Sequence, residues 1–398
     1  MSWRIVFAAV LAAACIPARG EEAFFPLMAW GHTPNDPAVL KRMSDCGLTV
    51  AGFVSPAALD ACRDVGLKAI VDDARSSRYD WMKVDPAVAR TNVEAMVKEV
   101  KDHPAVFGYL LRDEPSAAMF PGLAAVADAI QEFHPGAWPY INLFPNYAEP
   151  DQMAAPDYEA YVRKFVEVCK PPILSYDHYA LYEHGRLRPT YFANLETLRR
   201  AGLEHGLPFW NIILTTAHFD YREATPADIR FQVFTSLAYG AKGIAYFTYF
   251  SPKIGNFRLG PIDQFGNETP TWAMLREVNL QVARLAPTLL KLKSDAVYHF
   301  GEVPTDGRGP ADDSLVEAVE GPMLVGDFTH EDGSRWAMIV NRSFTDSIAC
   351  RPAPRVEGTT LEQVSPFTGR LEPYDGERIW LAPGQGVLLR LTASADPE

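Results

Sequence analysis

Short apolar runs alternate with helical patterns from Phe24 to about Pro252. Polar turns or turns marked by glycine and proline separate the runs from the helical segments. Nearly continuous apolar strands that alternate with helices pair in parallel and are covered on both faces, so the pattern predicts a parallel sheet flanked by helices. The eight runs are FFPLMAW, LTVAGFV, LKAIVDD, VFGYLLRDE, YINLFPN, ILSYDHY, FWNIILTT and GIAYFTYF.

The segments between the runs carry helix signals. Residues 85–103 and 225–241 place apolar residues at helical spacing and begin with Asp-Pro and Thr-Pro. Asp and Thr are favoured helix caps, and proline suits the first helical position. A further helix is expected over residues 269–292. Eight such units in about 230 residues fit one closed (β/α)₈ TIM barrel. A doubly wound open sheet is the alternative, which the absence of GxGxxG after the first run disfavours.

The pattern changes after Lys293. The segments SLVEAVEG, PMLVGDFTH, RWAMIVNRS, GTTLEQVS and GVLLRLTA alternate apolar and polar residues between turns rich in Asp, Gly and Pro. Such short alternating strands predict an antiparallel β-sandwich. We therefore expect a barrel domain over residues 21–293 and a sandwich domain over residues 294–398.

The first twenty residues are typical of an export signal. Arg4 precedes the apolar segment 5–16, and the small residues Ala18 and Gly20 suit a cleavage site. The sequence thus predicts a secreted or periplasmic protein. Cys15 follows LAAA, which resembles a bacterial lipoprotein signal, so an outer-membrane lipoprotein is the alternative. No later segment has eighteen uninterrupted apolar residues, and no integral membrane segment is expected.

Charge and cysteine content limit the partners. Against 37 Lys and Arg stand 50 Asp and Glu, a net charge of −13 that argues against a nucleic-acid partner. After the export signal, Cys46 and Cys62 could form a disulfide, and buried free thiols are the alternative for all four cysteines. Without CxxC or His-rich spacing, neither a metal site nor a cofactor is expected. The sequence does not indicate the oligomeric state.

The residues that end the apolar runs are the candidate site residues, because a barrel of this kind carries its active site at the carboxyl ends of its strands. Asp113 and Glu114 end the fourth run, and Asp177 ends the sixth. A ring of carboxylates, aromatics and amides is typical of a carbohydrate pocket. The residues expected to bind sugar hydroxyls or to stack on the ring are Trp30, His32, Asn142, His178, Tyr179, His218, Tyr246 and Tyr249.

Two carboxyl groups in one pocket suit the hydrolysis of a glycosidic bond. The reaction needs one protonated acid for the leaving oxygen and one carboxylate that attacks the anomeric carbon or activates water. Neighbouring carboxyl groups in a partly dry pocket acquire different pKa values. We therefore expect Glu114 to be the proton donor, Asp177 the nucleophile or base, and Asp113 the group that tunes Glu114.

The motif GYLLRDEP, with SLAYGAKGIAYFTYFSP, WAMIVNRS and LAPGQGVLLRL, resembles the clan A glycoside hydrolases. In that family the acid/base glutamate follows an asparagine at the fourth strand end, commonly as Asn-Glu-Pro, which implies the same role for Glu114. The chain departs from the family in two places. Asp113 replaces the asparagine, and FWNIILTTAH lacks the glutamate that serves as nucleophile at the seventh strand. Glu223 in the next loop is a poorly placed substitute, and Asp177 is the better one.

Two other functions remain open. An adjacent Asp-Glu at the fourth strand also resembles the hexosaminidases that use the acetamido group of the substrate as nucleophile. In those enzymes the aspartate orients the acetamido group and the glutamate is the acid. A barrel without a working carboxylate pair would instead be a glycan-binding protein.

Each candidate residue also has a structural explanation. Asp113 and Glu114 could cap the helix expected within PSAAMFPGLAAVADAI, and Asp177 could pair with Arg112. The histidines could satisfy hydrogen bonds in the core. Residues that could simply fill the barrel or cap a loop are Trp30, Trp210, Tyr246, Tyr249, Asp72 and Asp73.

Overall fold

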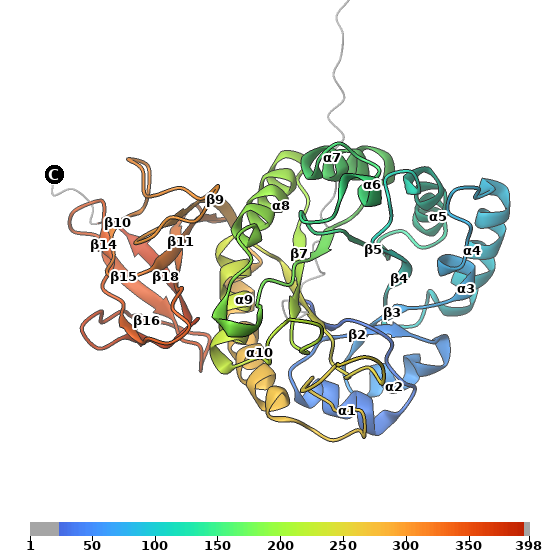
Figure 1. The fold of residues 1–398 in the computed structure, drawn as a ribbon, viewed down its shortest axis with the longest axis horizontal. Helices are drawn as coiled ribbons and strands as arrows, with labels where there is room; N and C mark the ends of the chain where they lie inside the picture. The colour runs from blue at the N-terminus through green and yellow to red at the C-terminus, as the bar shows by residue number, and fades with distance from the viewer. Residues whose placement is uncertain (1–23, 394–398) are drawn as a thin grey trace, which may run out of the picture.

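The computed structural model describes residues 24–393. The expected export signal over residues 1–20, with Cys15, lies outside the described residues. Eight parallel strands close into a barrel in sequence order, which confirms the predicted TIM barrel (Figure 1). The first strand pairs with the eighth, for example Leu27 with Ile244, so the open-sheet alternative is wrong.

Each of the eight predicted runs overlaps a barrel strand, and β5 begins two residues before its run. Most strands are shorter than their runs because the ends of each run belong to the loops. The strands are β1 Leu27–Ala29, β2 Val50–Val54, β3 Lys68–Val71, β4 Val106–Asp113, β5 Trp138–Leu143, β6 Leu174–Asp177, β7 Phe209–Leu214 and β8 Gly243–Phe247.

The helices surround the barrel and begin at the predicted caps. Asp85 accepts hydrogen bonds from the first turn of α4, and Thr225 forms a capping box with Asp228 at the start of α9. The α-helices are α1 Pro37–Asp45, α2 Leu59–Asp64, α3 Ala74–Ser77, α4 Pro86–Val100, α5 Phe120–Phe133, α6 Pro150–Met153, α7 Tyr158–Cys169, α8 Tyr191–His205, α9 Pro226–Ala238 and α10 Pro270–Leu289, with 3₁₀ turns η1 Pro56–Ala58 and η2 Glu183–Gly185.

Large aromatic side chains fill the interior of the barrel. Phe107 packs on Trp138 with ring centroids 4.6 Å apart, and Trp138 packs on Trp210 at 5.2 Å. Gly243 makes room for this layer, because a Cβ atom there would lie 2.4 Å from the Trp210 indole nitrogen. Trp210 is fully buried and therefore fills the barrel.

The C-terminal part is an antiparallel sheet domain, as predicted. A six-stranded sheet in the order β16-β15-β18-β12-β11-β9 is accompanied by two two-stranded ribbons, β10-β14 and β13-β17. The second layer is thus built from short ribbons instead of a full sheet. The strands are β9 Leu292–His299, β10 Val316–Ala318, β11 Met323–His330, β12 Arg335–Asn341, β13 Ile348–Ala349, β14 Ala353–Pro354, β15 Thr360–Val364, β16 Leu371–Pro373, β17 Trp380–Leu381 and β18 Gly386–Thr392.

Both faces of the six-stranded sheet are buried. On one face Leu324, Met338 and Leu388 join the core formed by the barrel and its helices. On the other face, Val325 and Ile339 form a separate core with residues of the ribbons. The sheet lies beside α9 (Figure 1). Because successive side chains of a strand point to opposite faces, each strand of the sheet contributes residues to both cores.

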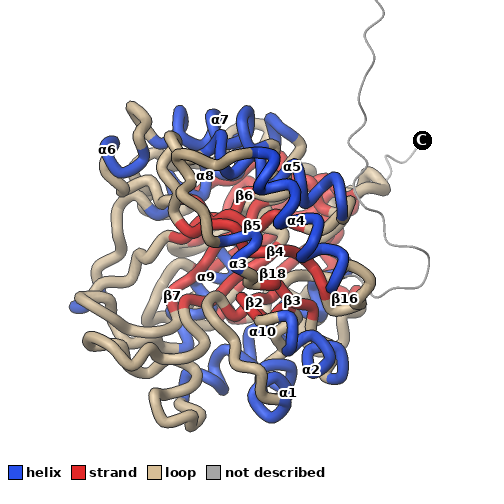
Figure 2. The backbone as a smooth tube through the Cα atoms, turned by 90° about the vertical axis from the view of Figure 1, so that its right-hand side faces the viewer, coloured by secondary structure: helices blue, strands red, loops and turns tan. Residues whose placement is uncertain are grey.

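Long loops gather at one end of the barrel, where β7 ends and where α6 lies (Figure 2). This end carries the carboxyl termini of the strands. Within residues 24–393, no helix is long and apolar enough to cross a bilayer. Cys46, Cys62, Cys169 and Cys350 are buried free thiols, as the second of the two interpretations held. The alternative of a disulfide between Cys46 and Cys62 is wrong.

Candidate active site

A β-bulge in β4 places Asp113 in the site. Between Leu110 and Arg112 the register of β4 against β5 shifts by one residue. Without the extra residue, Arg112 would lie beside Asn142, and the bulge puts Asp113 there instead. The Cα partners across the shift are Leu110 with Tyr140, Arg112 with Ile141, and Asp113 with Asn142.

Glu114 follows the strand in an unusual backbone conformation. Its φ of 43° lies in the left-handed region, which costs a non-glycine residue about 1–3 kcal/mol. The Glu114 amide donates a hydrogen bond of 2.9 Å to the Asn142 carbonyl, which holds this conformation. The strain therefore orients the carboxyl group of Glu114 relative to the strand ends, as is common at functional sites.

Asn142 links two of the three carboxyl groups. Its amide nitrogen donates to Asp113 at 3.1 Å and to Asp177 at 2.8 Å, while its oxygen accepts from the Ser175 hydroxyl at 3.0 Å. Tyr140 lies 2.9 Å from that hydroxyl. Asn142 is 1% exposed and lines the pocket, and its hydrogen bonds hold the carboxyl groups in place, while its expected contact with a sugar stays a prediction.

Asp177 is the most deeply buried of the carboxyl groups. It ends β6 and is 5% exposed. Burial raises its pKa well above the usual range, the negative charges of Glu114 and Asp113 add to this rise, and the hydrogen bond from Asn142 opposes it. Within the described residues Asp177 accepts from Asn142 and forms no ion pair with Arg112, whose charge acts on Asp113, so the structural explanation for Asp177 does not hold.

The carboxyl groups of Glu114 and Asp177 influence each other's protonation. Burial, with the charge of Asp113 as the second cause, raises the pKa of Glu114 to about 7. A hydrogen bond between the carboxyl groups of Glu114 and Asp177 opposes this rise, and such a bond requires a proton on one of them. The pair therefore provides one acid and one carboxylate near neutral pH.

The side chain of Asp113 is exposed to solvent on the pocket side. Protein atoms surround it on its other sides, and they remove much of its hydration. Burial raises its pKa, while the hydrogen bond from Asn142 and the charge of Arg112 lower it. Asp113 and Glu114 do not cap a helix, because α5 begins at Phe120 with Met119 as its cap. The three carboxyl groups thus converge at the strand ends without a structural task in the next helix.

A cavity of about 270 Å³ opens above the carboxyl groups. Aromatic side chains from several loops form its walls, and none of the described residues that line it is a lysine or an arginine. The lining residues are Trp30, Asp113, Glu114, Asn142, Tyr147, Asp177, Tyr179, His218, Phe219, Tyr221, Phe247 and Phe257.

Besides Asn142, three of the predicted binding residues line the pocket. Trp30 packs on Phe247 with ring centroids 5.4 Å apart, and Tyr179 packs on the same ring at 5.0 Å. The Nδ1 atom of His218 lies 2.9 Å from the Thr216 carbonyl oxygen. Within the described residues, His218 forms no hydrogen bond with Asp113, Glu114 or Asp177. Burial lowers the pKa of His218, which favours the neutral imidazole.

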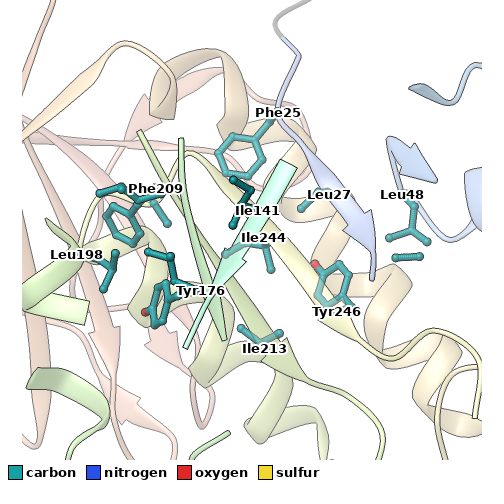
Figure 3. Packing of buried hydrophobic residues seen from close by; sticks show 14 of the residues in the cluster. Phe25, Leu27, Leu48, Ile141, Tyr176, Leu198, Phe209, Ile213, Ile244 and Tyr246 are labelled. Atoms are coloured by element: carbon teal, nitrogen blue, oxygen red, sulfur yellow. The ribbon is translucent and has the colours of Figure 1, made fainter. Parts of the chain in front are cut away.

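Tyr246 and Tyr249 lie outside the pocket, contrary to the expectation from the sequence. Tyr246 is fully buried on the outer face of β8, within the hydrophobic cluster between barrel and helices (Figure 3), and its hydroxyl donates to Asn279 at 2.5 Å. Tyr249 is also fully buried, and its hydroxyl accepts from the Trp272 indole at 2.9 Å. Because side chains alternate along a strand, Phe247 faces the pocket in place of Tyr246.

His178 and His32 also lie outside the pocket lining. His178 is fully buried behind Tyr147, with its Nε2 3.2 Å from the Thr190 hydroxyl. Burial lowers the pKa of His178 to about 3, so it is neutral. The side chain of His32 is 72% exposed and lies 3.7 Å from Asp72. Neither histidine is placed to contact a sugar held beside Glu114.

Other candidate carboxylates have structural partners. Glu223 forms an ion pair of 2.9 Å with Arg258 in the outer loops and does not line the pocket. Asp73 caps α3 and pairs with Arg75. Asp177 therefore stays the best placed partner of Glu114.

Sequence patterns missed five of the lining residues. Phe247 could have been found from strand alternation, because it shares the inner face of β8 with Ala245. The others lie in loops after strand ends, where no periodicity indicates direction. The missed residues are Tyr147, Phe219, Tyr221, Phe247 and Phe257.

Comparisons with solved structures show where this fold occurs. A structure described as a glycoside hydrolase matches 94% of this chain and 94% of its own, with a TM-score of 0.58 and 12% identity. A family 5 glycoside hydrolase from Bacteroides vulgatus ATCC 8482 matches 93% of this chain and 89% of its own, with a TM-score of 0.57 and 12% identity.

A β-galactosidase from the psychrophilic Marinomonas ef1 matches 66% of this chain at a TM-score of 0.50 and 13% identity, and the chain spans 60% of that protein. No protein-family model and no curated protein matches the sequence. The chain thus has the barrel-plus-sheet fold of these glycoside hydrolases, which confirms the resemblance at the level of the fold.

Proposed function

We propose that the protein is a glycoside hydrolase that cleaves O-glycosidic bonds with a pair of carboxyl groups. The observation that carries the proposal is the convergence of Glu114 and Asp177 in one pocket at the strand ends. Burial raises the pKa of both groups, the charge of Asp113 adds to the rise at Glu114, and the charges of Glu114 and Asp113 add to the rise at Asp177, so the pair holds a proton where one is needed for a leaving group. The fold shared with glycoside hydrolases supports the same conclusion.

The proposed roles follow from position and accessibility. Glu114 donates its proton to the glycosidic oxygen as the bond to the anomeric carbon breaks. Asp177 either attacks that carbon or removes a proton from an attacking water. Asp113 adds the negative charge that raises the pKa of Glu114. Asn142 holds Asp113 and Asp177 in place.

The separation of the two carboxyl groups distinguishes two mechanisms. Retaining enzymes keep their two carboxyl groups about 5–5.5 Å apart, and inverting enzymes about 6.5–9.5 Å. Glu114 and Asp177 both line the same pocket at the strand ends, so a sugar ring held there would meet both groups.

The pocket suits an uncharged sugar. Its lining combines three carboxyl groups with aromatic rings, and none of its described lining residues is a lysine or an arginine that could pair with an acidic sugar. Acidic groups and tyrosine hydroxyls bind sugar hydroxyls, while the rings of Trp30, Tyr179 and Phe247 bind the apolar faces.

A panel of neutral oligosaccharides tests the proposal. Wild type should release sugar from at least one of them, and Glu114→Gln should lower kcat/KM at least a hundredfold, since general acid catalysis contributes about 10²–10⁴. Glu159→Gln, in an exposed ion pair on α7, is the matched control and should keep full activity. Sugar binding in calorimetry without turnover by wild type would refute hydrolysis and leave a glycan-binding protein.

The substrate-assisted mechanism is the second candidate. Asp113 and Glu114 are adjacent and both line the pocket, whereas the loop after β7 contributes His218 and Tyr221 in place of a carboxylate. In this case the acetamido oxygen of the substrate attacks the anomeric carbon, and an aspartate orients the acetamido group. An enzyme of this kind would cleave 2-acetamido glycosides and be inhibited by the corresponding sugar thiazoline, whereas a paired-carboxylate enzyme would accept 2-hydroxy glycosides.

Export is part of the proposal and rests on the pattern of residues 1–20. N-terminal sequencing of the protein from its native cells tests it. A mature chain that begins near Glu21 supports cleavage by a signal peptidase, and one that begins at Cys15 with a lipid supports the anchored form. A chain that retains Met1 contradicts both.

A further inference from the structure

Phe219 is an exposed aromatic residue at the mouth of the candidate pocket. Its side chain lines the pocket and the residue is 71% exposed. Its φ of 49° lies in the left-handed region, which is strained for a bulky residue. A large apolar side chain in water and a strained backbone both disfavour this arrangement unless it serves a purpose.

The loop after β8 holds Phe219 in this conformation. The Asn256 side chain accepts a hydrogen bond of 2.7 Å from the Phe219 amide and donates one of 2.9 Å to the Phe219 carbonyl. Next to this contact, the backbones of Ala217 and Arg258 exchange two hydrogen bonds of 3.1 and 3.0 Å. These contacts tie the two loops together and orient the exposed ring.

Phe257 extends the same surface. It lines the pocket and stacks on His218 with ring centroids 4.7 Å apart and an angle of 8° between the planes. The centroids of Phe219 and Phe257 lie 6.4 Å apart. Two rings from different loops therefore form an apolar wall that continues from the carboxyl groups to the solvent.

We propose that Phe219 and Phe257 form a platform for the sugar residue that adjoins the one held at Glu114 and Asp177. This inference rests on the proposed function and deepens it. The cavity of about 270 Å³ takes roughly one sugar ring, so the next ring of a chain lies at the mouth, beside Phe219. The substrate class is an oligosaccharide or polysaccharide of neutral pyranoses, whose C–H faces pack on an aromatic ring.

The test compares a long substrate with a one-sugar substrate. The probes are β-1,3- and β-1,4-linked tetrasaccharides of glucose, mannose and xylose, and the fluorides of the same sugars, which occupy the pocket alone. Phe219→Ala should lower kcat/KM for the cleaved tetrasaccharide about tenfold and change it less than twofold for the fluoride. Asn256→Ala should cause a smaller loss in the same direction. Phe367→Ala, 85% exposed in the C-terminal domain, should change neither.

Equal losses on both substrates, or an unchanged rate on the tetrasaccharide, would overturn the platform while leaving the hydrolase intact. If wild type cleaves none of the probes, hydrolysis of these sugars by the paired carboxyl groups fails, and calorimetry with the same tetrasaccharides decides the platform separately. A tenfold higher Kd in Phe219→Ala would then support it, and equal affinity or an absence of binding would overturn it.

Discussion

The raised pKa of Glu114 makes the stability of the protein depend on pH, and Glu114→Gln should remove this contribution of Glu114. The folded-state pKa of about 7 lies above the ordinary value of 4.5. The folded state therefore binds the proton more tightly than the unfolded chain does. The resulting stabilisation is fully present below pH 4.5 and is lost as the pH rises through 7.

The magnitude follows from the size of the shift. At about 1.4 kcal/mol for each pKa unit, the shift corresponds to about 3 kcal/mol. Because the pocket side of the carboxyl group contacts solvent, we expect about 2 kcal/mol to be measured. Glutamine resembles the protonated acid at all pH values. Between pH 4.5 and 8, the free energy of unfolding of wild type should thus fall by about 2 kcal/mol relative to Glu114→Gln.

Calorimetric melting of both proteins across this pH range measures the difference. For a chain of this size, 2 kcal/mol corresponds to a change of about 2–3 °C in the difference between the two Tm values. Glu159→Gln, exposed on α7, controls for the loss of one surface charge. Parallel Tm curves for wild type and Glu114→Gln from pH 4.5 to 8 would refute the account of two buried carboxyl groups that influence each other's protonation.

Two further substitutions test the framework of the site and the contact between the domains. Asn142→Ala removes the amide that donates to Asp113 and Asp177, so we expect a loss of about 1–3 kcal/mol in urea unfolding and at least a tenfold fall in kcat; an unchanged kcat would contradict the positioning role. Gly326→Ala places a Cβ atom 2.0 Å from the Ala238 carbonyl oxygen, where α9 meets the sheet, and should lower the free energy of unfolding by about 1–3 kcal/mol. Gly309→Ala meets no atom within 4 Å and should behave like wild type, so equal Tm values for the two variants would show that α9 and the sheet are not tightly packed.

The barrel could be predicted because its strands are buried on both faces. Each apolar run overlaps one strand, and the Asp-Pro and Thr-Pro signals mark the starts of α4 and α9. The ends of each strand were harder to predict from the sequence, because residues at the ends of a run, such as Leu67 or Thr215, are as buried as the residues within the strands. Hydrophobicity reports burial, and it does not distinguish a strand end from a covered loop.

The sequence did not indicate which side chains of a strand point into the pocket, and this limited the prediction of the site. Tyr246 and Phe247 are neighbours at the end of β8, and only Phe247 lines the pocket. In a strand covered on both faces, both directions are apolar, so composition does not indicate which residue points inward. The same ambiguity placed His178 in the expected site, although Asp177 is the residue that faces it.

The bulge in β4 explains how Asp113 reaches the site in which the sequence placed it. Strict alternation from Leu110 would place Arg112 on the inner face, and the extra residue transfers that position to Asp113. The contributions of Tyr221 and Phe257 depend on contacts between loops that are distant in the sequence. Such contacts follow from the closed fold and leave no local signal.

The pH dependence of kcat/KM for an unactivated oligosaccharide tests the central claim most directly. If Glu114 donates the proton to the leaving group, kcat/KM should fall above a pKa of about 7, because the free enzyme then loses that proton. A rate that stays constant or rises from pH 6 to 9 would contradict the role of Glu114 as the acid.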